Sequence, residues 1–78
     1  MNGWANYETW ATQLYLFNTE GEYRYAMDML LVGLGREGLA ITLKADAPYV
    51  EITDMRGHDY RKVDWLEIAD AFIEAAEQ

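Results

Sequence analysis

The stretch Asn2-Gly3-Trp4-Ala5-Asn6-Tyr7-Glu8-Thr9-Trp10 places two tryptophans and a tyrosine at the N-terminal end of the chain. It also contains a helix-start signal, because the Asn6 side chain can accept a hydrogen bond from a free N–H of the first helical turn. Glu8, in that turn, is favourably placed against the positive end of the helix dipole. Termini fray unless they are held in place, so these large aromatic side chains predict that the N-terminus is anchored in the core.

Length and composition predict one small, soluble domain. The 78 residues are 51% hydrophobic and include no cysteine, so neither disulfides nor a thiolate zinc site can brace the fold. There is no basic region followed by an apolar run of the kind that marks a signal peptide. The longest apolar run, residues 29–34, is far shorter than the roughly 20 residues that span a bilayer. We therefore expect a cytoplasmic protein with no membrane partner.

The spacing of apolar residues predicts an α+β fold. Apolar side chains recur at helical intervals over three segments, about 7–17, 20–34 and 64–76. At about 39–44 and 49–54 the apolar and polar residues instead alternate, which favours a β-hairpin packed on the three helices. A continued helix through Leu39–Lys44 is the competing interpretation, against which the β-branched residues and Pro48 favour strands.

Charge is the most informative bulk property of the chain. Fourteen acidic residues against six basic ones give a formal net charge of −8. A protein with this charge repels nucleic acids and anionic membranes and is attracted to basic surfaces. The simpler interpretation is that the charge serves only solubility.

Four carboxylates recur at intervals of 3, 4 and 3 residues in the C-terminal helical segment: Glu67, Asp70, Glu74 and Glu77. This spacing places them on one face of the predicted helix, opposite its apolar stripe. The row spans about 15 Å at a rise of about 1.5 Å per residue, a scale comparable to successive phosphates of a nucleic-acid strand. It is either a solvated face that happens to be acidic or a mimic of phosphates. A second acidic patch is expected on the preceding long helix: Glu20, Glu22 and Asp28.

The remaining residues argue against catalysis and against a bound cofactor. The chain has no serine and no cysteine, so the two commonest nucleophiles are missing. His58 stands beside Asp59 in a polar loop, where we expect a solvated side chain. The glycines of residues 33–38 match GxGxxG, but they follow a predicted helix and precede none, so a dinucleotide site is not expected. No calcium-loop spacing is present. The sequence predicts no enzyme, no cofactor and no metal.

Two segments carry a resemblance to a known group of proteins. Trp4-Ala5-Asn6-Tyr7-Glu8-Thr9-Trp10-Ala11 resembles an N-terminal motif of small phage and mobile-element proteins of unknown function. Val63-Asp64-Trp65-Leu66-Glu67-Ile68-Ala69 is similar to the C-terminal segment of the same proteins. The resemblance implies a phage or prophage context and supplies no catalytic residues. Small acidic proteins from that context include inhibitors of host defence, such as anti-CRISPR and anti-restriction proteins.

The function expected from these observations is that of a small, acidic, phage-encoded inhibitor. It would bind a protein, with a CRISPR effector as the first candidate, and block a basic surface that normally holds nucleic acid. It would not bind nucleic acid itself, and it would be a monomer or a homodimer. The alternative is a homodimeric assembly module that uses exposed tyrosines, since tyrosine is favoured in interfaces. The candidates are Tyr15, Tyr23, Tyr25, Tyr49 and Tyr60.

Overall fold

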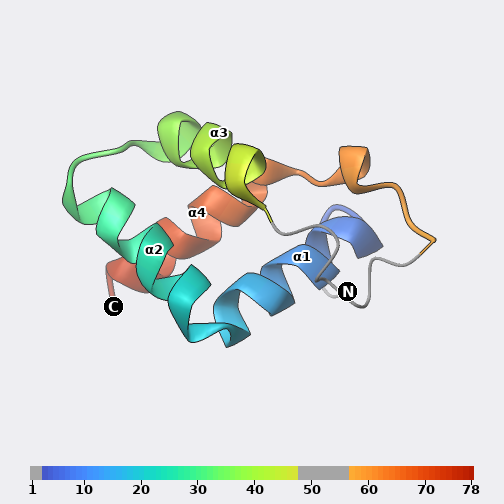
Figure 1. The fold of residues 1–78 in the computed structure, drawn as a ribbon, viewed down its shortest axis with the longest axis horizontal. Helices are drawn as coiled ribbons and strands as arrows, with labels where there is room; N and C mark the ends of the chain where they lie inside the picture. Colours follow the sequence, from blue (N-terminus) through green and yellow to red (C-terminus); the bar gives the residue numbers. More distant parts are fainter. Residues whose placement is uncertain (1–2, 48–56) are drawn as a thin grey trace.

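The computed structural model describes residues 3–47 and 57–78, which form four α-helices around a shared apolar core (Figure 1). They are α1 (Tyr7–Asn18), α2 (Glu20–Leu31), α3 (Arg36–Asp46) and α4 (Trp65–Ala76), and a short 3-10 helix, η3 (Tyr60–Lys62), precedes α4. Helix α4 packs on each of the other three α-helices and most extensively on α3. It runs through the middle of the arrangement in Figure 1.

The predicted α+β fold is wrong, because the described residues contain helices and no strand. Residues 39–44, expected as the first strand of a hairpin, lie inside α3. The second expected strand, 49–54, falls outside the described residues. The competing interpretation, a helix through Leu39–Lys44, is the one that the structure shows.

Helix α3 forms because its buried residues follow the helical period. Leu39, Ala40 and Leu43 are buried, whereas Ile41 is 70% exposed. The alternation of Leu39, Ile41 and Leu43 therefore does not mark one side of a strand. Leucine, alanine and lysine are good helix formers, and contact with α4 outweighs the weak strand preference of a short segment.

Helices α1 and α4 each begin directly after a residue whose side chain caps the first turn. Asn6 Oδ1 accepts the Thr9 backbone N–H over 2.8 Å, as expected from the sequence. Asp64 Oδ1 accepts the Glu67 backbone N–H over 3.1 Å at the start of α4. Each cap satisfies a donor that the first turn leaves unpaired.

Helix α2 ends at Leu31, three residues before the predicted end, because a Schellman motif closes it. The Gly33 N–H donates to the Leu30 carbonyl over 3.0 Å, and the Leu34 N–H donates to the Met29 carbonyl over 3.1 Å. This geometry requires a left-handed residue, and Gly33 supplies it with φ at +102°. The turn leads directly into α3.

The centre of the core is formed by the apolar face of α4 and the aromatic residues of the first two helices. Phe72 is fully buried, and its ring stacks on Phe17 with centroids 4.3 Å apart. Tyr23 approaches the same ring at 5.8 Å. These contacts fix the rotation of α4 and so decide which of its residues face solvent.

The N-terminal stretch holds the beginning of α4 through three hydrogen bonds. The Asp64 N–H donates to Thr9 Oγ1 over 2.8 Å, and the Asn6 amide donates to the Lys62 carbonyl over 2.8 Å. The Ala5 N–H donates to Glu67 Oε1 over 2.9 Å. The expected anchoring of the N-terminus is therefore a set of polar contacts as well as aromatic packing.

Candidate interaction surface on α4

Helix α4 separates a fully apolar face from an acidic one. Ile68, Ala69 and Phe72 have no exposed surface. The four carboxylates predicted as a row occupy the opposite side of the helix, where Glu67 is half-buried and the others are exposed: Asp70, Glu74 and Glu77. A residue spacing of 3, 4 and 3 produces this arrangement on any regular helix.

Glu67, at the N-terminal end of the row, is engaged within the protein. Its Oε1 accepts the Ala5 backbone N–H over 2.9 Å. This hydrogen bond joins the N-terminal stretch to α4 across 62 positions of the chain. Glu67 therefore holds the N-terminal stretch in position and also contributes negative charge to the row.

Asp70, the second member, forms a two-bond ion pair with Arg36 at the start of α3. The Arg36 Nε and Nη2 atoms donate to the two carboxylate oxygens over 2.8 and 2.9 Å. The hydrogen bonds from Arg36 lower the pKa of Asp70, and those to Asp70 raise the pKa of Arg36. Both side chains remain about half-exposed, so the pair modifies the surface without being removed from it.

Arg36 was not foreseen from the sequence as part of this surface. No lysine or arginine is interleaved with the row in the sequence, but Arg36 from α3 pairs with Asp70. The two residues stand 34 positions apart, and only the packing of α3 on α4 brings them together. No local signal in the sequence could have identified the pair.

Glu74 and Glu77 form the uncompensated end of the row. Both are exposed, and within the described part of the chain neither carboxylate has a hydrogen bond or an ion pair. Glu77 follows the last residue of α4. Within the row, the unpaired negative charge therefore lies at the C-terminal end of α4.

Trp4 lies beside the acidic row and not inside the core. The half-buried side chain lines a shallow hollow of about 350 Å³ together with Gly3, Ala71 and three members of the row: Glu67, Asp70 and Glu74. Trp10, the other tryptophan of the opening stretch, is half-buried, packs against the core and contacts Tyr7 at 5.5 Å. The two tryptophans thus have different surroundings.

The second predicted acidic patch lies on a separate helix, α2. Glu20 approaches Arg24 at 3.7 Å, and both side chains are highly exposed. Asp28 is exposed and Glu22 is half-buried. No hydrogen bond or ion pair links these residues to the α4 row within residues 3–47 and 57–78.

His58 has structural partners that the sequence did not indicate. Its ring stacks on Tyr7 with centroids 4.4 Å apart, and its Nδ1 lies 3.4 Å from Glu8 Oε2. The Glu8 residue is only 8% exposed. The pKa of Glu8 is lowered by a hydrogen bond with its own backbone and by His58, while burial opposes the shift. The expected solvated loop histidine is instead a contact between the loop and α1.

The tyrosine surface expected for the alternative function is largely absent from the described residues. Tyr15 and Tyr23 pack against the core. The Tyr25 hydroxyl donates to Asp46 over 2.7 Å, which also raises the pKa of Tyr25. Tyr60 is 50% exposed, and Tyr49 lies outside the described residues.

The described residues contain neither a cluster of metal ligands nor a membrane-spanning helix. None of their histidines or carboxylates gather in a group of three or more that could hold a metal ion. None of their helices combines the length and the apolar character needed to cross a membrane. Contrary to expectation, residues 33–38 do lead into a helix, because Gly33 and Gly35 precede α3 and Gly38 lies inside it. The segment follows α2, however, and not the strand that a dinucleotide site requires.

Comparison with known proteins identifies the family. Residues 1–77 match the model of a family described as "Family of unknown function (DUF7249)", and the chain belongs to that family. Searches among curated proteins and among solved structures find no match.

Proposed function

We propose that this protein is a small acidic inhibitor that acts inside a host cell by binding another protein. Its acidic α4 face would cover a basic surface on which the partner holds nucleic acid. The phage context implied by the opening motif makes a host defence complex, and first a CRISPR effector, the candidate partner. The action is one of binding, without catalysis.

The single observation that carries this proposal is the unpaired end of the acidic row. Glu74 and Glu77 are exposed and form no ion pair or hydrogen bond with another described residue. Like charges this close on one helix are mildly unfavourable for the helix itself. An arriving basic surface would relieve that repulsion, and the net charge of −8 would steer the approach.

The members of the row would contribute unequally to binding. Glu74 and Glu77 would meet cations of the partner directly. Asp70 would share its charge between Arg36 and the partner, because its carboxylate already accepts two hydrogen bonds. Glu67 would act mainly by holding the N-terminal stretch in place.

The experiment is capture of the partner from a host lysate with the tagged protein and two matched double variants. Glu74→Lys/Glu77→Lys reverses two charges on α4. Glu20→Lys/Asp28→Lys reverses two charges on α2 and leaves α4 unchanged. We expect the wild type and the α2 variant to retain one nucleic-acid-binding protein that the α4 variant loses.

Two results would contradict the proposal. Equal loss in both variants would mean that net charge, and not the α4 face, attracts the partner. Capture that is unchanged between low and high salt would also contradict it, because attraction between exposed charges weakens as the Debye length falls from about 10 Å at 0.1 M to about 3 Å at 1 M.

Self-association is the second function to be measured, on the basis of the half-exposed ring of Tyr60. Light scattering of the wild type and of Tyr60→Ala separates the two possibilities. A dimer that Tyr60→Ala dissociates would favour the assembly module. A monomer that captures a partner favours the inhibitor.

A further inference from the structure

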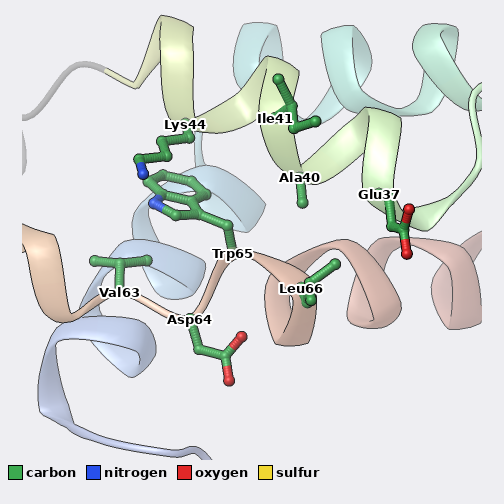
Figure 2. Close-up of a pocket in the computed structure, with 8 residues that line it drawn as sticks. All are labelled: Glu37, Ala40, Ile41, Lys44, Val63, Asp64, Trp65 and Leu66. Carbon is green, nitrogen blue, oxygen red and sulfur yellow. The ribbon is translucent and has the colours of Figure 1, made fainter.

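An apolar groove runs between α3 and the beginning of α4 (Figure 2). Its volume is about 430 Å³. Ala40, Val63 and Trp65 form a floor that is nearly closed to solvent. Figure 2 shows the Trp65 indole extending toward α3, with the Lys44 side chain beside it.

Two large aliphatic side chains flank this floor without being buried by it. Ile41 on α3 is 70% exposed, and Leu66 on α4 is 38% exposed. Both line the groove. Single exposed apolar residues are ordinary, but two that border one apolar hollow form a contiguous surface of the kind that marks a binding site.

The rim of the groove is acidic on the side of α4 and at the start of α3. Asp64 and Glu37 line the groove, and both are exposed. Asp64 uses one carboxylate oxygen, Oδ1, to cap α4. Lys44 also lines the groove, at the opposite end from Glu37 (Figure 2). A side chain that enters the groove would therefore be followed most favourably by cationic neighbours on the side of Glu37 and Asp64.

The groove and the acidic face of α4 are adjacent. Leu66 stands four positions before Asp70, so the two side chains are neighbours along the helix surface. Glu37 follows Arg36, the residue that bridges α3 to Asp70. A partner that covers the acidic face would therefore reach the groove with the residues at its edge.

We propose that this groove receives a large apolar side chain from a segment of the partner in which lysine or arginine flanks that side chain. The inference rests on the proposed function for the identity of the partner. The apolar side chain would fill the space between Ile41 and Leu66 over the Trp65 floor. The flanking cations would meet Glu37 and Asp64.

Charge argues against a second copy of this chain as the occupant. Each copy carries a net charge of −8, and a symmetric contact would bring the acidic rims together. Like charges opposed across an interface are costly. A basic segment has the complementary charge.

A synthetic peptide with one leucine between lysines is the probe, and an NMR titration is the measurement. We expect the largest shifts at Ile41 and Leu66. Replacing the peptide leucine by alanine, or its lysines by glutamates, should each weaken binding about tenfold, as does loss of a central contact in many interfaces.

Matched variants locate the contact on the protein. Ile41→Gln should lower the protein's affinity for the leucine peptide about tenfold, whereas Val32→Gln should leave that affinity unchanged. Val32 is the appropriate control because it is also 70% exposed. It is the C-cap residue of α2 and does not line the groove. Glu37→Gln/Asp64→Asn removes the rim charge while asparagine retains the helix cap, and it should reduce the salt dependence of binding.

Any of three binding results would overturn the inference: no binding of the leucine peptide, equal loss in the Ile41 and Val32 variants, or self-association that Ile41→Gln abolishes. Contacts from residues 48–56 to the Ile41 methyls in the free protein would assign the groove to the chain itself and also overturn it. The proposed function is tested separately, because Glu74 and Glu77 do not line the groove. If the peptide binds but Glu74→Lys/Glu77→Lys still captures the partner, only the proposed function fails.

Discussion

Helices α3 and α4 pack against each other but bury their apolar residues to different extents. Helix α4 places Ile68, Ala69 and Phe72 fully inside. Helix α3 buries Leu39 and leaves Ile41, two positions later, 70% exposed. Helix α4 is thus held by a fully buried apolar stripe and leaves Leu66 38% exposed at its beginning, whereas α3 leaves Ile41 largely in solvent.

The difference indicates separate tasks for the two helices. Rigid packing of α4 fixes the direction of its carboxylates, which a mimic of regularly spaced phosphates would need. Helix α3 supplies Arg36 to Asp70 and Ile41 to the groove, so it shapes the edges of the same surface. Mutations that disturb the buried face of α4 should therefore act on stability, and mutations at the exposed positions of either helix should act on binding.

The largest effect is expected when the buried face of α4 is broken. Phe72→Ala removes a fully buried ring that stacks on Phe17, and it should lower the free energy of unfolding by about 3–5 kcal/mol. A domain of this size has a total of about 4–12 kcal/mol, so the variant would lose at least about a quarter of its stability. Urea unfolding followed by circular dichroism measures this loss.

Ile41→Ala is the matched control on α3. It should change the free energy of unfolding by less than about 0.5 kcal/mol, because the residue is mostly exposed. A loss comparable to that of Phe72→Ala would show that the two helices do not differ as described.

The next effect concerns the hold of the N-terminal stretch on α4. Asn6→Ala removes the cap of α1 and the bond to the Lys62 carbonyl, and should cost about 1–2 kcal/mol. Thr19→Ala, at the start of α2, should cost less because its side chain makes no capping hydrogen bond. If urea unfolding shows that both variants lose the same free energy of unfolding, the opening stretch has no special role in stability.

A smaller effect is expected in acid, at the contact between α1 and the loop. The folded protein lowers the pKa of Glu8, so its stabilisation is complete above the ordinary value of 4.5 and is lost as pH falls through the folded-state pKa. Glu8→Gln should therefore flatten the decline in unfolding free energy below about pH 4.5.

Glu74→Gln is the control for that pH profile. No described residue pairs with its carboxylate, so the variant removes one acidic charge without removing a contact. If Glu8→Gln flattens the decline no more than Glu74→Gln does, the contact of Glu8 with its backbone and His58 contributes nothing in solution.

The smallest effect on stability, and an increase in binding, is expected from Arg36→Gln. The half-exposed pair with Asp70 stabilises the fold little, because solvent screens it. Its loss frees the Asp70 carboxylate and makes the α4 face more negative. The variant should bind the captured partner more tightly at low salt than the wild type does, and weaker binding would show that Arg36 positions the surface.

The difference between α3 and α4 also explains what could be predicted from the sequence. The spacing of apolar residues in α4 and the cap of α1 are local signals, and the structure contains both elements. The strand prediction for residues 39–44 is wrong because Leu39, Ile41 and Leu43 recur every two residues as on one face of a strand, although Ile41 is exposed and the two leucines are buried. The residue that misled the prediction is the one assigned here to partner binding.

The candidate surface was predictable only in part, for the same reason. Intervals of 3, 4 and 3 place the acidic residues along α4 without any knowledge of the fold. The bond from Ala5 to Glu67 and the pair between Arg36 and Asp70 join residues that are distant in the chain. Contacts of this kind depend on tertiary packing, which no local pattern encodes.

Competition between this protein and nucleic acid for the captured partner tests the central claim most directly. If the α4 face occupies the nucleic-acid site, rising concentrations of the protein should raise the partner's apparent Kd for its nucleic acid without limit, and Glu74→Lys/Glu77→Lys should abolish the effect. A stable complex that contains protein, partner and nucleic acid together, at unchanged affinity for the nucleic acid, would contradict the claim.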